Sequence, residues 1–220
     1  MVERRQFTRA LLLGMPALTW SRLGEAAGGQ AAGPPDFAAL IERLSPAVVA
    51  IGNAKSTVGS GFVTRGGAIV TAAHVVQGAG AGLSVISSAG RHPARVLATD
   101  QPRDLALLEA QGHTPAAMLP LAGAPPRVGE WIVVLGNPFG AGLVATAGIV
   151  SAAAGAITTA AFVEKLQINA AVNPGNSGGP VCNLRGEVIA VASSLVPGGQ
   201  GIAFATPAAA IERLLKSQQR

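Results

Sequence analysis

The sequence predicts an all-β protein in which two antiparallel β-barrels follow one another, with a short helix at each end. Three observations carry this prediction. Between residues 46 and 205, short runs rich in Val, Ile, Ala and Thr are interrupted by Gly, Pro or Asn at spacings of roughly eight to twelve residues, as in many short antiparallel strands. These runs form two similar sets, one on either side of Gly129. Apolar residues at helical spacing flank the whole region.

The N-terminus has the composition of an export signal. Residues 3–9 are basic, and residues 10–20 form an uncharged, mostly apolar run that is too short to span a bilayer comfortably. Arg4 and Arg5, followed by Phe7, resemble the twin-arginine motif of bacterial signals. Small alanines downstream offer sites for cleavage.

The predicted signal peptide determines which residues we assign to the folded domain, the charge of the mature chain and the compartment in which it acts. We expect a signal peptide and flexible segment at residues 1–32, a domain at residues 33–220 and a periplasmic or secreted protein; an uncleaved anchor or a frayed amphipathic N-terminus is the alternative. The mature chain would carry 12 basic and 9 acidic residues, without a basic cluster that contains aromatic residues, so we expect no nucleic-acid partner and no stable membrane insertion. Cys182 is the only cysteine, so packing rather than an intrachain disulfide must stabilise the fold.

The first barrel is expected to follow a short helix. Pro35 ends a flexible stretch, and Asp36 stands where a helix N-cap would, ahead of apolar residues at helical spacing. Helix and barrel together are assigned to residues 36–124, with strands at residues 48–52, 61–64, 68–71, 83–86, 94–98 and 105–109.

The second barrel is expected at residues 125–205 and is followed by a helix at residues 206–217. Thr206 is expected to cap this helix, with Pro207 at its first position and an apolar stripe along one side. The barrel strands are assigned to residues 131–136, 143–152, 165–168, 181–183, 188–193 and 201–205.

A glycine-rich turn at residues 173–180 (NPGNSGGP) presents Ser177 as a candidate nucleophile. A serine hydroxyl is a poor nucleophile at neutral pH, so it requires a base at hydrogen-bonding distance and N–H groups that receive the charge developing on a substrate carbonyl. Because Gly175 and Gly178 have no Cβ atoms, the backbone can turn sharply there and point consecutive N–H groups the same way.

The base and its orienting carboxylate are selected from five candidates. His74 follows a strand-like run and has small neighbours, whereas His92 and His113 are expected to be exposed in loops or at a strand edge. Asp104 immediately precedes an apolar strand that would hold it rigid, whereas Asp100 lies in a turn where Asp is common for local reasons.

The order His74, Asp104, Ser177 separates fold families that share this chemistry. Residues 175–179 also match G-x-S-x-G, the nucleophile elbow of α/β-hydrolases, but there the base follows the serine, and this chain has no histidine after Ser177. A subtilisin-like order, with the aspartate before the histidine, would require Asp36. Asp36 stands at a helix start beside the signal, which argues against this order. The order of the chymotrypsin-like enzymes remains.

Several motifs now identify a family resemblance. The chain resembles the HtrA/Deg trypsin-like serine proteases over roughly residues 41–211, and several spaced motifs in order are more specific than one. The segments that carry the resemblance are GSGFV at 59–63, TAAHVV at 71–76, DLALL at 104–108, GNPFG at 136–140, GIVS at 148–151, NPGNSGGP at 173–180 and GIAFA at 201–205.

The resemblance implies a double six-stranded β-barrel of the chymotrypsin type with a cleft between the barrels. It implies His74, Asp104 and Ser177 as the catalytic triad, and the backbone N–H groups of Gly175 and Ser177 as the oxyanion hole. It implies no metal and no cofactor.

The resemblance also locates a substrate pocket and two departures from the family. Ile202, Ala203 and Phe204 would line the primary specificity pocket; since they carry no charge, we expect small aliphatic residues before the scissile bond. Asn169 stands where many members have Asp, which questions one loop-ordering contact. Asn176 replaces the Asp that pairs with a freed N-terminal amine in digestive relatives, so we expect no zymogen switch of that kind.

Taken together, we expect a serine endopeptidase that cleaves unfolded or damaged exported proteins in protein quality control. The family usually carries PDZ domains after the protease, and we expect a protease domain without them, with a homotrimer as a possible assembly. The alternative is a catalytically silent pseudoprotease that binds unfolded chains like a chaperone. A purely structural envelope protein would have no need of the Ser, His and Asp order.

Overall fold

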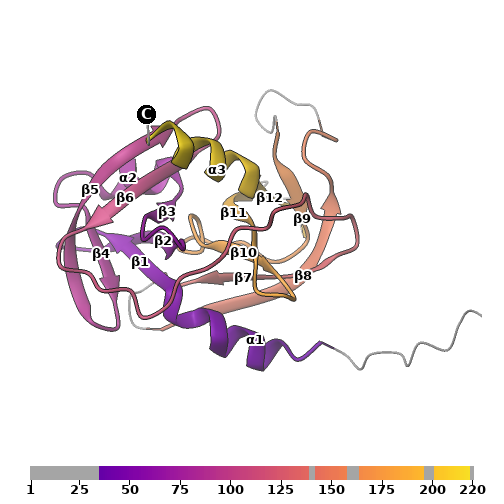
Figure 1. Ribbon diagram of the computed structural model, residues 1–220, viewed down its shortest axis with the longest axis horizontal. Coiled ribbons are helices and arrows are strands. Elements are labelled where there is room, and N and C mark those ends of the chain that lie inside the picture. Colours follow the sequence, from indigo (N-terminus) through magenta and orange to yellow (C-terminus); the bar gives the residue numbers. More distant parts are fainter. Residues whose placement is uncertain (1–34, 139–141, 158–163, 196–200, 219–220) are drawn as a thin grey trace, which may run out of the picture. The chain divides into compact units, whose positions relative to one another are not determined.

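Two closed six-stranded antiparallel β-barrels confirm the predicted fold class (Figure 1). The computed structural model describes residues 35–138, 142–157, 164–195 and 201–218, so the predicted signal peptide at residues 1–32 lies outside the described residues. The barrels share one strand order, which is β1-β2-β3-β6-β5-β4 in the first and β7-β8-β9-β12-β11-β10 in the second. The strands are β1 (Val48–Gly52), β2 (Thr57–Val63), β3 (Ile69–Thr71), β4 (Ser84–Ser87), β5 (Gly90–Asp100), β6 (Leu105–Ala110), β7 (Trp131–Gly136), β8 (Val144–Ala152), β9 (Leu166–Ile168), β10 (Pro180–Asn183), β11 (Val188–Leu195) and β12 (Ala203–Pro207).

Alternation along the strands divides the apolar side chains between the barrel interiors and a shared core. Ile69 of β3 lies in the core of the first barrel, whereas its neighbour Val70 belongs to a cluster to which both barrels contribute. Ile132 and Val133 of β7 divide in the same way for the second barrel. Successive side chains of a strand point to opposite faces, so both faces of these strands are buried and the barrels are joined by apolar packing.

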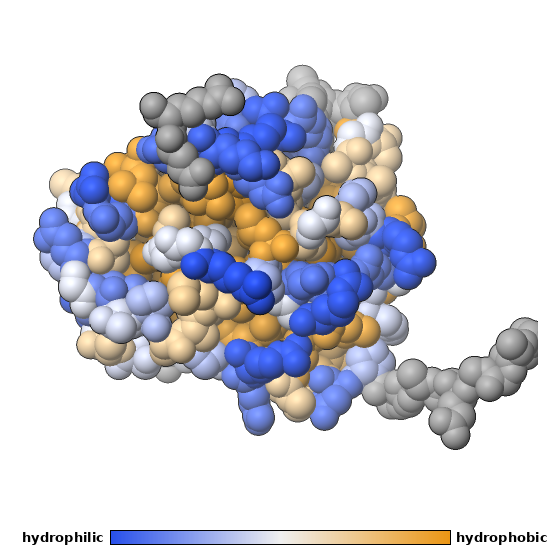
Figure 2. Space-filling model, viewed as in Figure 1, coloured by the Kyte–Doolittle hydropathy of each residue, from blue (hydrophilic) through white to orange (hydrophobic). Residues whose placement is uncertain are grey.

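Two helices cover this shared cluster. Helix α1 (Phe37–Leu44) begins as predicted, since the Asp36 carboxylate accepts a hydrogen bond from the Ala39 N–H at 3.0 Å. Its Phe37 ring packs edge-on against Trp131 of the second barrel, with ring centroids 5.7 Å apart. Helix α3 (Ala208–Ser217) buries one face in the same cluster, and Figure 2 shows hydrophilic side chains over its other face.

The structure corrects two helical predictions. A third helix, α2 (Ala73–Ala79), follows β3 directly, and it was missed because its N-cap, Ala72, has no side chain that could signal a helix start. Thr206 is not the cap of α3; it lies in β12, and Pro207 takes the N-cap position. The Thr206 hydroxyl instead donates to the carbonyl oxygen of Arg103 at 2.7 Å. None of the described helices combines the length and the apolarity needed to cross a membrane.

Candidate active site

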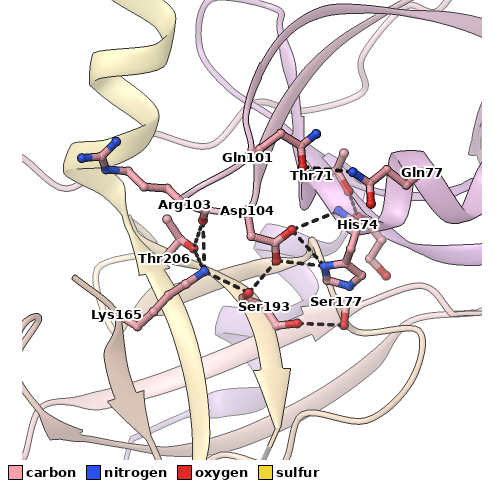
Figure 3. Close-up of polar contacts among 11 residues, drawn as sticks. Thr71, His74, Gln77, Gln101, Arg103, Asp104, Lys165, Ser177, Ser193 and Thr206 are labelled. Atoms are coloured by element: carbon pink, nitrogen blue, oxygen red, sulfur yellow. Dashed lines mark hydrogen bonds and ion pairs between the residues drawn. The ribbon is translucent and has the colours of Figure 1, made fainter. Parts of the chain in front are cut away.

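His74 lies in the first turn of α2, and three contacts join it to Asp104 (Figure 3). Its ring Nδ1 is 2.8 Å from Asp104 Oδ2 and 3.0 Å from Oδ1, and its backbone N–H donates to Oδ1 at 3.0 Å. An ionised carboxylate can accept hydrogen bonds but cannot donate them, so Nδ1 carries the ring proton. The other ring nitrogen, Nε2, is therefore free to accept a proton.

Asp104 stands just before β6 in a conformation that few residues adopt. Its φ is +57°, in the left-handed region, and its N–H donates to the Gln101 carbonyl at 3.1 Å. Burial raises the pKa of this carboxyl, but hydrogen bonds from the His74 ring, the Ser193 hydroxyl and the His74 backbone N–H outweigh it and hold the pKa below its ordinary value. The Ser193 bond to Oδ2 is 2.6 Å long. Asp104 is therefore ionised at neutral pH.

Ser177 is placed by a tight turn whose glycines approach other backbone segments. The Asn176 N–H donates to the Asn173 carbonyl at 3.0 Å, and Gly175, third in this turn, has a φ of +100°, as a type II turn requires. On the other side, Gly178 has a φ of +84°, and a Cβ there would stand 2.2 Å from the Ser60 carbonyl oxygen. The backbone of the turn is thus seated against the first barrel.

His74 and Ser177 line one cavity of about 330 Å³. The Ser177 hydroxyl donates to the Ser193 carbonyl oxygen at 3.3 Å, which is at the long limit for such a bond, so rotation about the Cα–Cβ bond can release it. The residues around the cavity come from the first barrel, α2 and the turn: Val58, His74, Val172, Asn173, Pro174, Gly175 and Ser177.

Two backbone N–H groups beside the cavity have no acceptor in the part of the chain that the structure describes. Among the described residues, no hydrogen bond uses the N–H of Gly175 or of Ser177. The Gly175 carbonyl oxygen, by contrast, accepts from the Ser60 hydroxyl at 2.6 Å, and Ser60 Oγ accepts from the Asn137 N–H at 2.8 Å. Ser60 thereby holds the carbonyl side of the turn, and the unpaired N–H groups are available to an oxygen atom in the cavity.

The predicted substrate-pocket residues lie apart from this cavity. Ile202 is exposed, whereas Ala203 and Phe204 are buried in β12, where they pair with Ile168 and Gln167 of β9. None of the three is among the residues that line the cavity of His74 and Ser177. Their role in specificity stays a prediction.

Asp100, His92 and His113, which were rejected as members of the site, make other local contacts. Asp100 accepts from Arg103, through the backbone N–H at 3.2 Å and the guanidinium at 3.1 Å, which is the local turn role expected of it. His92 and His113 are half-buried rather than exposed, because their rings pack edge-on with centroids 5.1 Å apart. Burial, and then the charge of His92, lower the pKa of His113. In the part of the chain that the structure describes, no group of three His, Cys, Asp or Glu side chains is placed to hold a metal ion.

The two asparagines singled out as departures differ in their side-chain contacts. Asn169 Oδ1 accepts from the Ile149 N–H at 2.7 Å, so an amide oxygen orders this loop against β8. Asn176 is buried, and its Nδ2 has no partner among the described residues.

Sequence reasoning missed three residues behind Asp104: Lys165, Ser193 and Thr206. The Lys165 ammonium donates to both hydroxyls, and Ser193 donates onward to Asp104. No local sequence signal marks this group, because its members meet across 28 to 89 positions of sequence.

Residues 59–191, which include His74, Asp104 and Ser177, match the family described as trypsin-like peptidase domain. The chain belongs to this family. The trypsin-like chain is 31% identical over 246 residues to a probable periplasmic serine endoprotease, DegP-like, of Hahella chejuensis, covering 92% of this chain and 51% of that protein. A protein of the same description from Rhizobium meliloti is 38% identical over 164 residues, covering 72% of this chain and 32% of that protein.

A solved structure agrees with the trypsin-like assignment. The crystal structure of the serine endoprotease from Yersinia pestis superimposes with a TM-score of 0.71 at 30% identity, covering 84% of this chain and 67% of that chain. The chain spans about half of the length of the Hahella protein and about a third of the Rhizobium protein.

Proposed function

We propose that the chain is a serine endopeptidase in which Ser177 is the nucleophile, His74 the base and Asp104 the orienting carboxylate. One observation carries the proposal. Ser177 and His74 line the same cavity, and Asp104 holds the far side of the imidazole. The two backbone N–H groups at the cavity have no acceptor among the described residues. These are the four parts that acyl transfer through a serine requires.

The proposed reaction begins when the Ser177 hydroxyl turns from the Ser193 carbonyl toward His74 Nε2. His74 takes the hydroxyl proton as Ser177 Oγ attacks the carbonyl carbon of a peptide bond, and Asp104 stabilises the imidazolium. The N–H groups of Gly175 and Ser177 donate to the oxyanion of the tetrahedral intermediate. His74 then gives the proton to the departing amine, and water, activated by the same histidine, releases the acyl group from Ser177.

We propose unfolded or damaged exported polypeptides as substrates. An extended chain can present a peptide carbonyl to an open cavity, whereas a folded one rarely does. Ile202, Ala203 and Phe204 are uncharged, which supports cleavage after small aliphatic residues. Relatives described as periplasmic and the twin-arginine-like N-terminus support export to the periplasm, and a homotrimer is a possible assembly there.

Substitution of the nucleophile tests the function. Ser177→Ala should abolish both hydrolysis of casein and labelling by a fluorophosphonate, because no other hydroxyl belongs to the described residues that line the cavity with His74. Circular dichroism should show an unchanged fold. Hydrolysis and labelling that persist in this variant would refute the assignment. A wild-type protein that suppresses aggregation of unfolded chains but is never labelled would instead be the chaperone-like pseudoprotease.

A further inference from the structure

A buried lysine lies behind Asp104, on the side away from His74 (Figure 3). Lys165 immediately precedes β9 of the second barrel, and 6% of its surface is exposed. Lysine is seldom this buried unless its charge is paired or hydrogen-bonded, because the ammonium loses its hydration. The triad chemistry proposed above gives it no role.

Each hydrogen-bond donor of the Lys165 ammonium has an oxygen acceptor. Its Nζ lies 3.0 Å from the Arg103 carbonyl oxygen, 3.0 Å from Ser193 Oγ and 2.5 Å from Thr206 Oγ1. An ammonium has three N–H donors and no acceptor, so each of the three oxygens accepts one bond. The three oxygens therefore satisfy all of the hydrogen-bond donors of one ammonium group.

This arrangement fixes the direction of two hydroxyl protons. Ser193 and Thr206 each accept from Lys165, which leaves each hydroxyl one proton to donate. Ser193 donates it to Asp104 Oδ2 at 2.6 Å, and Thr206 donates it to the Arg103 carbonyl at 2.7 Å. The ammonium therefore acts on Asp104 through Ser193.

The same cation also holds the peptide group before Asp104. The Arg103 carbonyl oxygen accepts from both Lys165 and Thr206, and the next residue has the left-handed φ of +57°. A non-glycine residue in that region persists where its surroundings fix it. Lys165 thus links the second barrel to the backbone segment that orients the Asp104 carboxylate toward His74.

The charged groups near Lys165 determine its electrostatic interactions. Asp104 and Asp100 are the acidic groups whose attraction opposes the effect of burial, which lowers the pKa of Lys165. The Arg103 guanidinium bonds to Asp100 and to Glu164, with Nε 2.7 Å from the Glu164 carboxylate, and Arg213 of α3 lies 3.4 Å from the same carboxylate. Lys165 is therefore the cation whose hydrogen bonds lead to Asp104.

We propose that Lys165 is a positioning residue for the His74–Asp104 pair. It directs the Ser193 hydroxyl onto Asp104, holds the Arg103 peptide and offsets part of the carboxylate charge that His74 experiences. The effect on turnover rests on the proposed peptidase function, whereas the effect on the protonation of His74 does not.

The test replaces Lys165 by methionine, which is similar in length but has neither charge nor donors. For Lys165→Met we expect kcat to fall at least tenfold with KM changed less than threefold, since Lys165 does not line the cavity. Loss of a nearby cation leaves more of the Asp104 charge to attract the imidazolium proton, so the pKa of His74 should be higher in the variant than in the wild type. NMR titration of His74 measures this shift whether or not the protein is active.

Matched variants separate this role from general destabilisation. Lys216→Met removes an exposed lysine of α3 and should change neither kcat nor the titration of His74. Lys165→Gln keeps two N–H donors without the charge; it should raise the pKa of His74 as methionine does but retain more of kcat. Combined with Ser193→Ala, Lys165→Met should cost less than the product of the two separate effects, because Lys165 acts through Ser193.

The proposal is overturned if a folded Lys165→Met protein keeps kcat within twofold and the titration of His74 within 0.1 pH unit. It is also overturned if kcat falls merely in proportion to the unfolded fraction. If neither variant folds, the wild-type protein decides: the Lys165 ammonium resonance should exchange slowly and shift as His74 titrates, and a resonance that ignores that titration refutes the role. Failure of fluorophosphonate labelling in the wild type would refute the peptidase function and leave the NMR result standing.

Discussion

The two barrels contribute to the candidate site by different physical means. The first barrel supplies His74 and Asp104, and side-chain hydrogen bonds place both of them. The second barrel supplies Ser177, and the backbone conformation of glycine places it. We therefore expect the first half of the site to be sensitive to removal of polar atoms, and the second half to addition of atoms.

The close approaches around the serine turn make this contrast concrete. A Cβ on Gly175 would stand 2.1 Å from the Pro138 Cβ, and a Cβ on Gly179 would stand 2.0 Å from the Leu135 carbonyl oxygen. Contacts this short force the backbone to move. Around Asp104, by contrast, the close neighbours are hydrogen-bond donors. Substitution there removes hydrogen bonds to the carboxylate rather than creating a steric clash.

Among the substitutions that test this contrast between the barrels, the largest effect is expected for Asp104→Asn, which keeps the shape of the side chain. Asparagine tolerates a left-handed φ, so the backbone at +57° should persist. Its amide group can donate to His74 Nδ1 and so favour the tautomer whose Nε2 cannot accept the Ser177 proton. We expect kcat to fall about 10⁴-fold, measured with a chromogenic peptide. Activity within tenfold of the wild type would show that Asp104 does not orient the histidine.

The stability of the same variant should depend on pH in a defined direction. The pKa of Asp104 is lowered in the folded protein, so its carboxylate stabilises the fold above its ordinary pKa, and that stability is lost as the pH falls through the lowered value. Asp104→Asn should therefore be less stable than the wild type near neutral pH, and the difference should shrink toward pH 3, as urea unfolding can measure. A difference that is constant with pH would argue against an ionised, hydrogen-bonded carboxylate.

The second-largest effect is expected for Gly175→Ala, which breaks the other half of the site. The new methyl group meets Pro138, and the residue must leave the left-handed φ of +100°, so the N–H no longer points into the cavity. Loss of one oxyanion donor lowers kcat about 10²- to 10³-fold. The NMR titration of His74 should stay unchanged, because the contacts of His74 with Asp104 do not involve the turn.

Gly112→Ala is the matched control for this variant. Gly112 also has a left-handed φ, of +67°, but a Cβ there meets nothing within 4 Å. It should lose stability and keep its full kcat. If Gly112→Ala lowers kcat as much as Gly175→Ala does, strain in general rather than the geometry of the turn would explain both results.

The sequence predicted the parts of the fold that have local signatures. Strands β1 and β7 have the predicted bounds, because an apolar run ends at a glycine in each of them. Helix α2 was missed because seven residues without a capping side chain give no periodic signal, yet it places His74. The candidates His74, Asp104 and Ser177 were found because the chemistry restricts their residue types and their order along the chain.

The support behind Asp104 could not be found in the same way. Ser193 meets Asp104 across 89 positions of sequence, and Lys165 meets Ser193 across 28. Neither residue has a characteristic neighbour in sequence, and a lysine beside an apolar strand suggests an exposed charge rather than a buried one. These contacts arise when two barrels close around one cluster, so local patterns do not encode them.

The smallest effect is expected for Glu164→Gln, the neighbour of the buried lysine on the same segment. The Arg103 hydrogen bond, and then its charge, lower the pKa of Glu164, so the pair contributes stability above the ordinary pKa of a glutamate and loses it as the pH falls. About half of the Glu164 side chain is exposed, so solvent and salt screen the pair. We expect kcat to stay within about twofold and any change to vanish in high salt.

Glu109→Gln, which breaks the exposed pair with Arg95 on the first barrel, is the matched control for Glu164→Gln and should behave alike. The comparison with Lys165→Met then decides which part of the segment matters. Residues 164 and 165 both reach Arg103, one through its guanidinium and the other through its part-buried backbone carbonyl. If Glu164→Gln lowers kcat tenfold, the whole segment would position Asp104; if only Lys165→Met does so, the position of the Asp104 carboxylate depends on the buried ammonium.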